Sequence, residues 1–167
     1  MSVAEHRTHA PASVRCAVIT VSDTRTEATD ASGRAIADLL AGGGHSVVHR
    51  AIVPDEPTRI RAVLDEMLAR EDVDAVLTTG GTGITARDGT YEVVNTLLEK
   101  RLDGFGELFR MLSYTEVGPA AMLSRACAGL AKGRIVVAMP GSEAAVRLAM
   151  HKLLVPELGH MVREARR

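Results

Sequence analysis

Four apolar-rich runs alternate with segments of helical spacing along the chain, and each run ends in a polar turn. They occupy residues 14–21, 46–53, 74–79 and 134–139. Short apolar runs of this kind are typical of strands buried on both faces, as in a parallel sheet. Strands that alternate with helices form an open, mostly parallel sheet with helices on both faces. The sequence therefore predicts an α/β fold.

The intervals between these runs carry helix start and stop signals. Asp30 or Ser32 is expected to cap the first helix, which the glycines at 42–44 end, and Pro57 suits the first turn of the second. Further helices are expected over 93–98, 104–115 and 119–128, the last ended by Gly129, with a long final helix capped by Ser142.

Composition limits the class of protein. A chain of 167 residues is long enough for one domain that buries most of its apolar surface, and we place this domain at 14–167, after a polar, disordered tail at 1–13. The net charge of −1 and the aromatic content of 2% argue against a nucleic-acid partner, because both a basic surface and a stacking platform are missing.

The two cysteines and the first residues bear on location. Cys16 falls in a strand and Cys127 at the end of an expected helix, so we expect free thiols in a reducing compartment. The first thirteen residues lack the apolar core of a signal peptide, and no apolar run approaches the length of a membrane span. We expect a cytoplasmic protein with no membrane partner.

The loop after the third run carries the strongest functional signal. Gly80, Gly81 and Gly83 let a ligand approach the main chain closely. The neighbouring threonines and the next helix N-terminus favour an anion. Asp88 would repel a phosphate unless a cation lay between them, so the loop predicts a phosphate together with a metal.

Other interpretations of this loop are weaker. A plain strand-to-helix turn seldom needs so many small residues beside an acid. Residues 81–86 fit the dinucleotide pattern G-x-G-x-x-A, but the acid expected about 20 residues later would fall at 101–104, which does not resemble a strand end. The Gly-Lys-Ser/Thr motif of a Walker phosphate-binding loop is missing from the sequence.

Polar residues also follow the other three runs, at Ser22-Asp23, Asp55 and Gly141-Ser142. Ligands of such sheets bind beyond the carboxyl ends of the strands, so these turns should converge at one edge. Each has a structural alternative: Asp23 as a local turn, Asp55 as a helix-start acid, and Ser142 as a cap alone.

Residues 78–83, followed by Arg87-Asp88, Thr90 and Glu92, resemble the signature of the molybdenum cofactor biosynthesis family, the MoaB/MogA group. Further similar segments lie at 22–25, 53–56, 104–110, 113–114, 124–125 and 139–142. The similarity spans about residues 14 to 160, and the short C-terminus resembles the MoaB branch. Gly89 and Tyr91 depart from the Val and Pro common in the family, without removing a polar group.

The resemblance implies a three-layer α/β/α fold with a mixed, mostly parallel sheet and one antiparallel strand. It also implies a molybdopterin adenylyltransferase, a nucleotidyltransferase that takes ATP and molybdopterin as substrates, uses Mg²⁺, and releases pyrophosphate. A homo-oligomer, either a trimer or a hexamer, is implied as well.

The chemistry assigns roles to the acids. The acceptor phosphate is already an anion and needs no strong base, so we assign Asp55 and Asp88 to Mg²⁺ and the nucleotide phosphates. The glycine loop would hold the nucleotide, and the turn after the last run the pterin phosphate, with two further candidates on the pterin side, Ser113 and Arg125. The substrate and nucleotide candidates are Ser22, Asp23, Thr79, Gly80, Gly81, Thr82, Gly83, Ser113, Arg125, Pro140, Gly141 and Ser142.

Two functions outside this class stay open at this point. A pathway protein could bind the pterin or the nucleotide as a scaffold without turnover, although the presence of both acids favours the enzyme. An oxidoreductase of the nicotinamide type is disfavoured, because its fingerprint would lie on the third strand.

Overall fold

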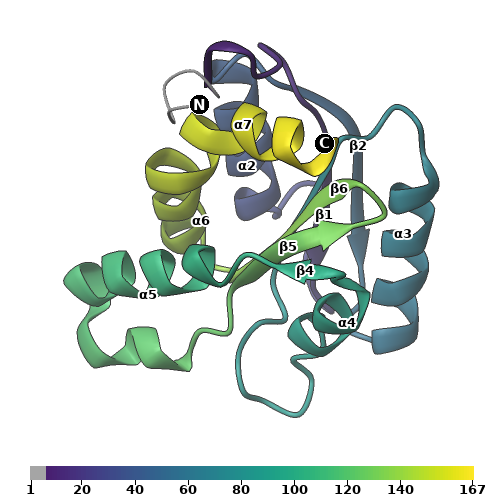
Figure 1. Cartoon of the computed structure of the whole chain (residues 1–167). Coiled ribbons are helices and arrows are strands. Elements are labelled where there is room, and N and C mark those ends of the chain that lie inside the picture. Colours follow the sequence, from purple (N-terminus) through teal and green to yellow (C-terminus); the bar gives the residue numbers. More distant parts are fainter. Residues whose placement is uncertain (1–6) are drawn as a thin grey trace.

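The computed structural model describes residues 7–167, and six strands form one sheet in the order β2-β1-β3-β6-β5-β4 (Figure 1). The strands are β1 (Arg15–Val21), β2 (Ser46–Val53), β3 (Ala75–Thr79), β4 (Lys100–Arg101), β5 (Cys127–Ala131) and β6 (Arg134–Met139). The first three and β6 run parallel, whereas β5 is antiparallel to β6 and β4 is antiparallel to β5.

The helices begin largely where the sequence predicts. They are α2 (Ala31–Gly42), α3 (Pro57–Ala69), α4 (Thr90–Leu97), α5 (Asp103–Val117), the 3₁₀ helix η1 (Gly118–Leu123), α6 (Glu143–Ala149), the π-helical η2 (Met150–Leu154) and α7 (Val155–Ala165). Asp30 caps α2 by accepting a hydrogen bond from the Gly33 amide at 2.9 Å, and Ser142 caps α6.

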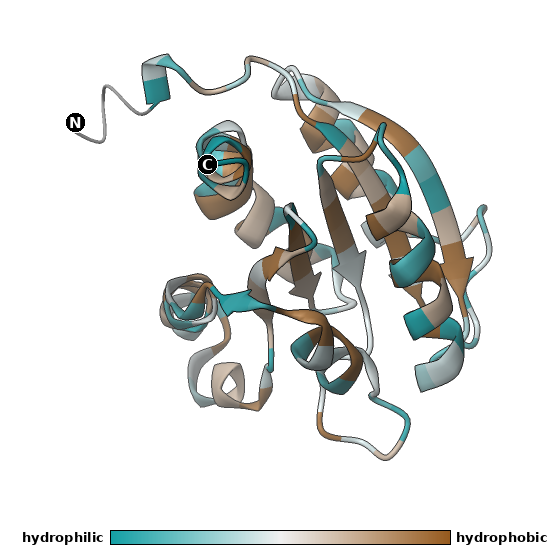
Figure 2. Ribbon diagram, turned by 45° about the vertical axis from the view of Figure 1, so that its right-hand side comes forward, coloured by the Kyte–Doolittle hydropathy of each residue, from teal (hydrophilic) through white to brown (hydrophobic). Residues whose placement is uncertain are grey.

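Helices cover both faces of the sheet (Figure 1). Successive residues of the central strands alternate between two apolar clusters: Leu77 belongs to the cluster that includes residues of α2, α5, α6 and α7, and Val76 to the one that includes residues of α3 and α4. Figure 2 shows the apolar strands between helices that carry their hydrophilic residues mainly on the outside. The predicted three-layer α/β/α fold with a mixed, mostly parallel sheet is thus confirmed.

The helix expected over 119–128 is wrong. The chain instead forms η1 and then enters β5, so Cys127 lies in a strand, where burial raises the pKa of its thiol to about 11. A Cβ on Gly129 would lie 2.3 Å from the Lys100 carbonyl oxygen, so small residues here allow β4 and β5 to pair. Tertiary pairing overrides the helix preference of the alanines.

The start of the described chain lies against α7. Arg7 forms an ion pair with Glu157, and a Cβ on Gly159 would lie 2.7 Å from the Pro11 carbonyl oxygen. The rest of the expected disordered tail, residues 1–6, lies outside the described residues. Within 7–167 no helix is both long and apolar enough to cross a membrane.

Candidate functional site

A polar cavity of about 710 Å³ lies where the four parallel strands end. Its lining comes from the turns after β1, β2, β3 and β6, as expected for a sheet of this type. The site residues predicted from the sequence that line this cavity are Ser22, Asp23, Asp55, Thr79, Gly80, Gly81, Thr82, Gly83, Asp88, Pro140, Gly141 and Ser142. The cavity therefore contains every sequence-predicted site residue except Ser113 and Arg125.

The glycine loop needs its glycines for close packing. Gly80 and Gly81 adopt backbone φ angles of +100° and +69°, which residues other than glycine rarely adopt. A Cβ on Gly80 would lie 2.2 Å from the Val21 carbonyl oxygen, and one on Gly141 would lie 3.3 Å from the Gly80 Cα. The three turns after β1, β3 and β6 therefore meet backbone to backbone.

Asp55 is a buried acid, 8% exposed, with no ion pair to any residue within 7–167. Its Oδ1 accepts a hydrogen bond from the Gly89 amide at 3.1 Å, and its Oδ2 lies 2.9 Å from where a Gly81 Cβ would stand. Burial raises the pKa of Asp55, and the nearby charges of Asp88 and Asp23 raise it further. A cation here would relieve that repulsion.

Asp88 faces the same loop at Gly83, two positions after Gly81. Its Oδ2 accepts hydrogen bonds from the Thr85 amide at 2.8 Å and the Thr85 hydroxyl at 2.7 Å. Burial acts to raise the pKa of Asp88, but these bonds outweigh it, so the pKa lies below its ordinary value. Asp88 is therefore ionised at neutral pH.

Asp23 links the first turn to both other regions. Its Oδ1 accepts from the Asp55 amide at 3.0 Å and from Arg87 Nη2 at 2.7 Å, and Arg87 Nε donates to Oδ2 at 3.0 Å. The bonds from Arg87 lower the pKa of Asp23. The local turn is made by Ser22, whose hydroxyl oxygen accepts from the amides of Thr24 and Arg25. Sequence reasoning did not assign Arg87 to the site, although it precedes Asp88.

Hydroxyl groups hold the turn after β6. Thr79 donates to the Pro140 carbonyl at 2.8 Å, and Ser32 donates to the Gly141 carbonyl at 2.7 Å. The Ser142 hydroxyl accepts from the Ala145 amide at 3.3 Å. Ser32, considered in the sequence only as a possible cap, thus fixes the turn from α2.

The two exceptions lie beside the cavity. Ser113 lines a second, mainly apolar cavity of about 490 Å³ between α5, η1 and α6, which shares Ser124, Pro140 and Ser142 with the first. Arg125 holds the glycine loop from outside the cavity, with its Nε donating to the Gly83 carbonyl at 2.8 Å.

The acids fit a magnesium ion that shares its coordination with a substrate. Residues 7–167 contain no group of three or more His, Cys, Asp or Glu side chains placed to hold a metal. Mg²⁺, however, is commonly bound by one or two carboxylates together with substrate phosphates and water. Asp55 and Asp88 supply two such hard oxygen donors beside the glycine loop.

The buried Thr90 hydroxyl faces the same loop. It has no hydrogen-bond partner within the described chain, and it lies 2.2 Å from where a Gly81 Cβ would stand. Sequence reasoning did not single it out, because a threonine in the first turn of a helix carries no distinct signal.

Fold and site together define an α/β/α domain with a polar cavity at the carboxyl ends of the parallel strands of a mixed sheet. The family model described as "Probable molybdopterin binding domain" matches residues 17–160. Molybdenum cofactor biosynthesis protein B of Bacillus subtilis (strain 168) is 51% identical, covering 100% of this chain and 99% of the relative.

Solved structures agree. A crystal structure of molybdenum cofactor biosynthesis protein B has a TM-score of 0.90 and 53% identity, covering 94% of this chain and 98% of that one. The tungsten cofactor synthesizing protein MoaB from Pyrococcus furiosus has a TM-score of 0.85 and 39% identity, with 95% and 100% covered. The chain belongs to the molybdenum cofactor biosynthesis family, the MoaB/MogA group, on its MoaB branch.

Proposed function

We propose that the protein binds molybdopterin and adenylylates it with Mg-ATP, releasing pyrophosphate. The observation that carries the proposal is a pair of carboxylates, Asp55 and Asp88, that flank a glycine loop in a polar cavity. Neither forms an ion pair with another residue of the described chain, so both carboxylates are available to a cation. The family's description and its relatives' names support molybdopterin as the ligand.

The site would hold two anions apart. Backbone amides of the glycine loop and the N-terminus of α4 would hold the nucleotide phosphates. The turn at Gly141-Ser142 precedes α6 and would hold the acceptor phosphate, whose oxygen attacks the α-phosphorus of ATP. Because this oxygen is already anionic, the residues need only to align it with the departing pyrophosphate.

Asp55 and Asp88 would hold the metal and not abstract a proton. When bound, Mg²⁺ would supply the positive charge that offsets the phosphate oxygens and the leaving group. The Thr85 hydrogen bonds keep Asp88 ionised for this task, and the Gly89 amide fixes the second acid, Asp55, through one oxygen while leaving the other toward the loop.

The second cavity suits the pterin ring system. It adjoins the polar cavity at Ser124, Pro140 and Ser142, so one ligand can lie in both. Apolar side chains such as Phe109 and Leu148 would cover the flat rings, and Ser113 offers a hydroxyl for a ring heteroatom.

The direct test is incubation with molybdopterin, Mg²⁺ and ATP, followed by product analysis. Adenylylated molybdopterin and pyrophosphate in equal amounts are expected, with Asp88→Asn as the inactive control. Binding of both substrates without any product would instead support a scaffold role in the same pathway.

We also propose a homo-oligomer, a trimer or a hexamer. Six large apolar side chains on α5 and η1 are between 46% and 74% exposed. The surface of a monomeric protein rarely exposes so many apolar side chains on neighbouring elements. The six are Leu108, Met111, Tyr114, Val117, Met122 and Leu123. Light scattering should give a mass of at least three chains, and Met111→Glu should reduce it; a monomer at micromolar concentration would exclude the assembly.

A further inference from the structure

Arg125 contacts both ends of the loop that carries Asp88. Its backbone amide donates to the Thr82 carbonyl at 3.1 Å, and its Nε donates to the Gly83 carbonyl at 2.8 Å. Its Nη2 reaches the carbonyl of Asp88 itself at 3.3 Å. One guanidinium thus spans the segment from Gly83 to Asp88.

The first turn of α4 holds this guanidinium in place. Nη1 of Arg125 forms an ion pair with Glu92, and that hydrogen bond lowers the pKa of the Glu92 carboxyl. The ring of Tyr91 lies under the guanidinium, with Cζ 5.0 Å from the ring centroid. Arg101 lies over the same ring at 5.9 Å. The Arg125 side chain therefore has partners on its edges and on its face.

Between these anchors the loop is also tethered by Arg87, which bonds to Asp23, but both side chains of this pair are exposed and such pairs contribute little. Ile84, near the tip of the loop, is 68% exposed, so the tip gains no stability from packing into the core. The Asp88 carboxylate is oriented by Thr85, which belongs to the same loop. A change in the distance between the loop ends would therefore move Thr85 and Asp88 together.

We propose that Arg125 is a positioning residue that sets the place of Asp88 by clamping the two ends of this loop, with Tyr91 and Glu92 holding the clamp. Its effect on turnover rests on the proposed adenylyl transfer, whereas its effect on the loop does not. A lysine at this position would keep the charge but could not reach both carbonyls, because an ammonium lacks the planar fork of arginine.

The test compares Arg125→Lys and Arg125→Gln with Arg110→Lys. Arg110 is a matched control, because it donates to the carbonyls of Ser124 and Ala126, on either side of Arg125, without contacting the loop. Amide hydrogen exchange over residues 82–88 should be at least about 10-fold faster in both Arg125 variants, since loss of a clamp raises local opening. It should be unchanged in the control.

Function gives the second measurement. In the Arg125 variants kcat should fall by about 10²-fold, the scale of a 1 Å misplacement, while the KM for molybdopterin stays within about 2-fold. Mn²⁺ affinity in the presence of ATP, measured by electron paramagnetic resonance, should fall with kcat. Tyr91→Phe should keep wild-type exchange in the loop, because it keeps the aromatic ring. Tyr91→Leu should show part of the faster exchange of the Arg125 variants. This pair still tests the clamp if Arg125→Gln does not fold.

The outcomes are separable. Loop exchange that is unchanged in Arg125→Lys and Tyr91→Leu overturns the clamp. Faster exchange with full kcat and full Mn²⁺ affinity overturns the positioning role. If the wild-type protein forms no product, the proposed function fails, and hydrogen exchange with Mn²⁺ affinity still decides the clamp.

Discussion

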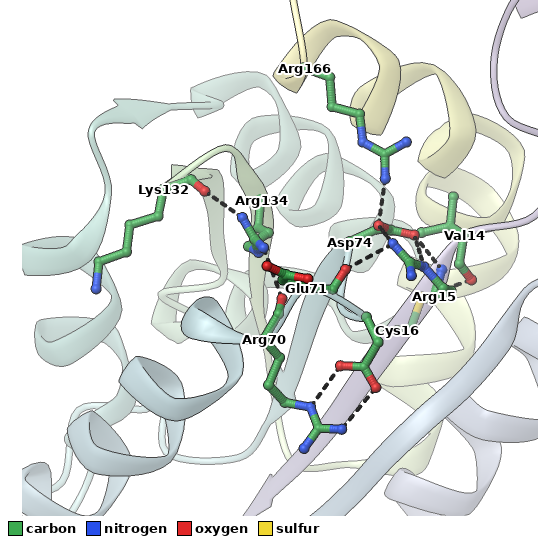
Figure 3. Close-up of polar contacts among 10 residues, drawn as sticks. Val14, Arg15, Cys16, Arg70, Glu71, Asp74, Lys132, Arg134 and Arg166 are labelled. Atoms are coloured by element: carbon green, nitrogen blue, oxygen red, sulfur yellow. Dashed lines mark hydrogen bonds and ion pairs between the residues drawn. The ribbon is translucent and has the colours of Figure 1, made fainter.

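Two aspartates at opposite ends of the sheet are equally buried but differ in their partners. Asp55, at the carboxyl end of β2, is 8% exposed, and Asp74, at the amino end of β3, is 7% exposed. Asp74 accepts from the Arg15 amide, Nε and Nη2 at 2.9, 3.1 and 2.8 Å, and it also pairs with Arg166 (Figure 3). Among described residues, the side chain of Asp55 has one hydrogen bond, from an amide.

The pKa values of the two acids move in opposite directions. Burial acts to raise both, but the bonds from Arg15 outweigh it at Asp74, whose pKa is lowered, whereas the pKa of Asp55 is raised. Burial alone therefore does not fix the direction in which the pKa of a buried acid moves, whereas the presence or absence of a basic partner does. Asp74 joins β1, β3 and the end of α7 through its arginine partners, whereas Asp55 has no basic partner among the described residues.

The largest effect is expected from removing the charge at the carboxyl end. Asp55→Asn or Asp88→Asn should lower kcat/KM for adenylylation by at least about 10²-fold, because each removes a group that holds charge near the leaving group. The melting temperature of Asp55→Asn should not fall, since this carboxylate has no basic partner to lose, whereas that of Asp88→Asn should fall slightly because this change weakens the two hydrogen bonds from Thr85. Near wild-type turnover in a folded variant would falsify the assignment.

The next largest effect is expected at the amino end. Asp74→Asn should lower the free energy of unfolding by about 2 kcal/mol, as it breaks charged hydrogen bonds to two arginines. Urea unfolding measures the free energy of unfolding. The kcat should stay at the wild-type value, because the candidate site lies at the opposite, carboxyl ends of the strands. A large loss of kcat with unchanged stability would reverse the roles given to the two ends.

The pH dependence of stability should show the opposite pKa directions. The lowered pKa of Asp74 means that its stabilising effect is complete above the ordinary aspartate pKa of about 3.9 and is lost as pH falls through the folded value. Asp74→Asn should therefore flatten the acid limb of the unfolding curve. The raised pKa of Asp55 has the opposite sign and acts above the ordinary value, where stability is lost as pH rises through the folded pKa. Asp55→Asn should therefore make stability rise more steeply with pH in that range; equal slopes in the two variants would contradict the comparison.

The smallest effect is expected from the arginine–aspartate pair at the carboxyl end. Arg87 and Asp23 are bonded by two hydrogen bonds, like Arg15 and Asp74, but both side chains are exposed, at 58% and 40%. Exposed pairs contribute little, so Arg87→Gln should leave the unfolding midpoint unchanged within error. A midpoint shift as large as that of Asp74→Asn would show that the exposed pair is a structural contact too.

Local signals made much of the fold predictable. The four parallel strands are apolar runs, and their turns hold glycines and acids, so β1, β2, β3, β6 and the two acids of the site could be located from sequence. The two-residue β4 consists of exposed Lys100 and Arg101, and β5 is built from small residues, so neither has a strand pattern. Their pairing depends on contacts distant in sequence.

The same limit applies to the site. Asp55 lies two residues after β2 and Asp88 lies in the loop between β3 and α4, so both acids could be located from the strand ends and the glycine signature. The contact of Ser32 with Gly141 joins residues 109 positions apart, and that of Arg87 with Asp23 joins residues 64 apart. Arg125 is predicted only as a candidate on the pterin side; its contacts with the glycine loop depend on how the segment before β5 docks there, which no local pattern encodes.

The pairing of β3 with β6 has a consequence for synthesis on the ribosome. The Thr79 hydroxyl and its partner carbonyl at Pro140 are 61 positions apart, and the Gly80 amide bonds to Met139. At about 5–20 residues per second, the ribosome adds Pro140 about 3–12 s after Thr79. A nascent chain therefore exposes the open edge of β3 during this interval, and the lining of the polar cavity is complete only after translation has passed Ser142.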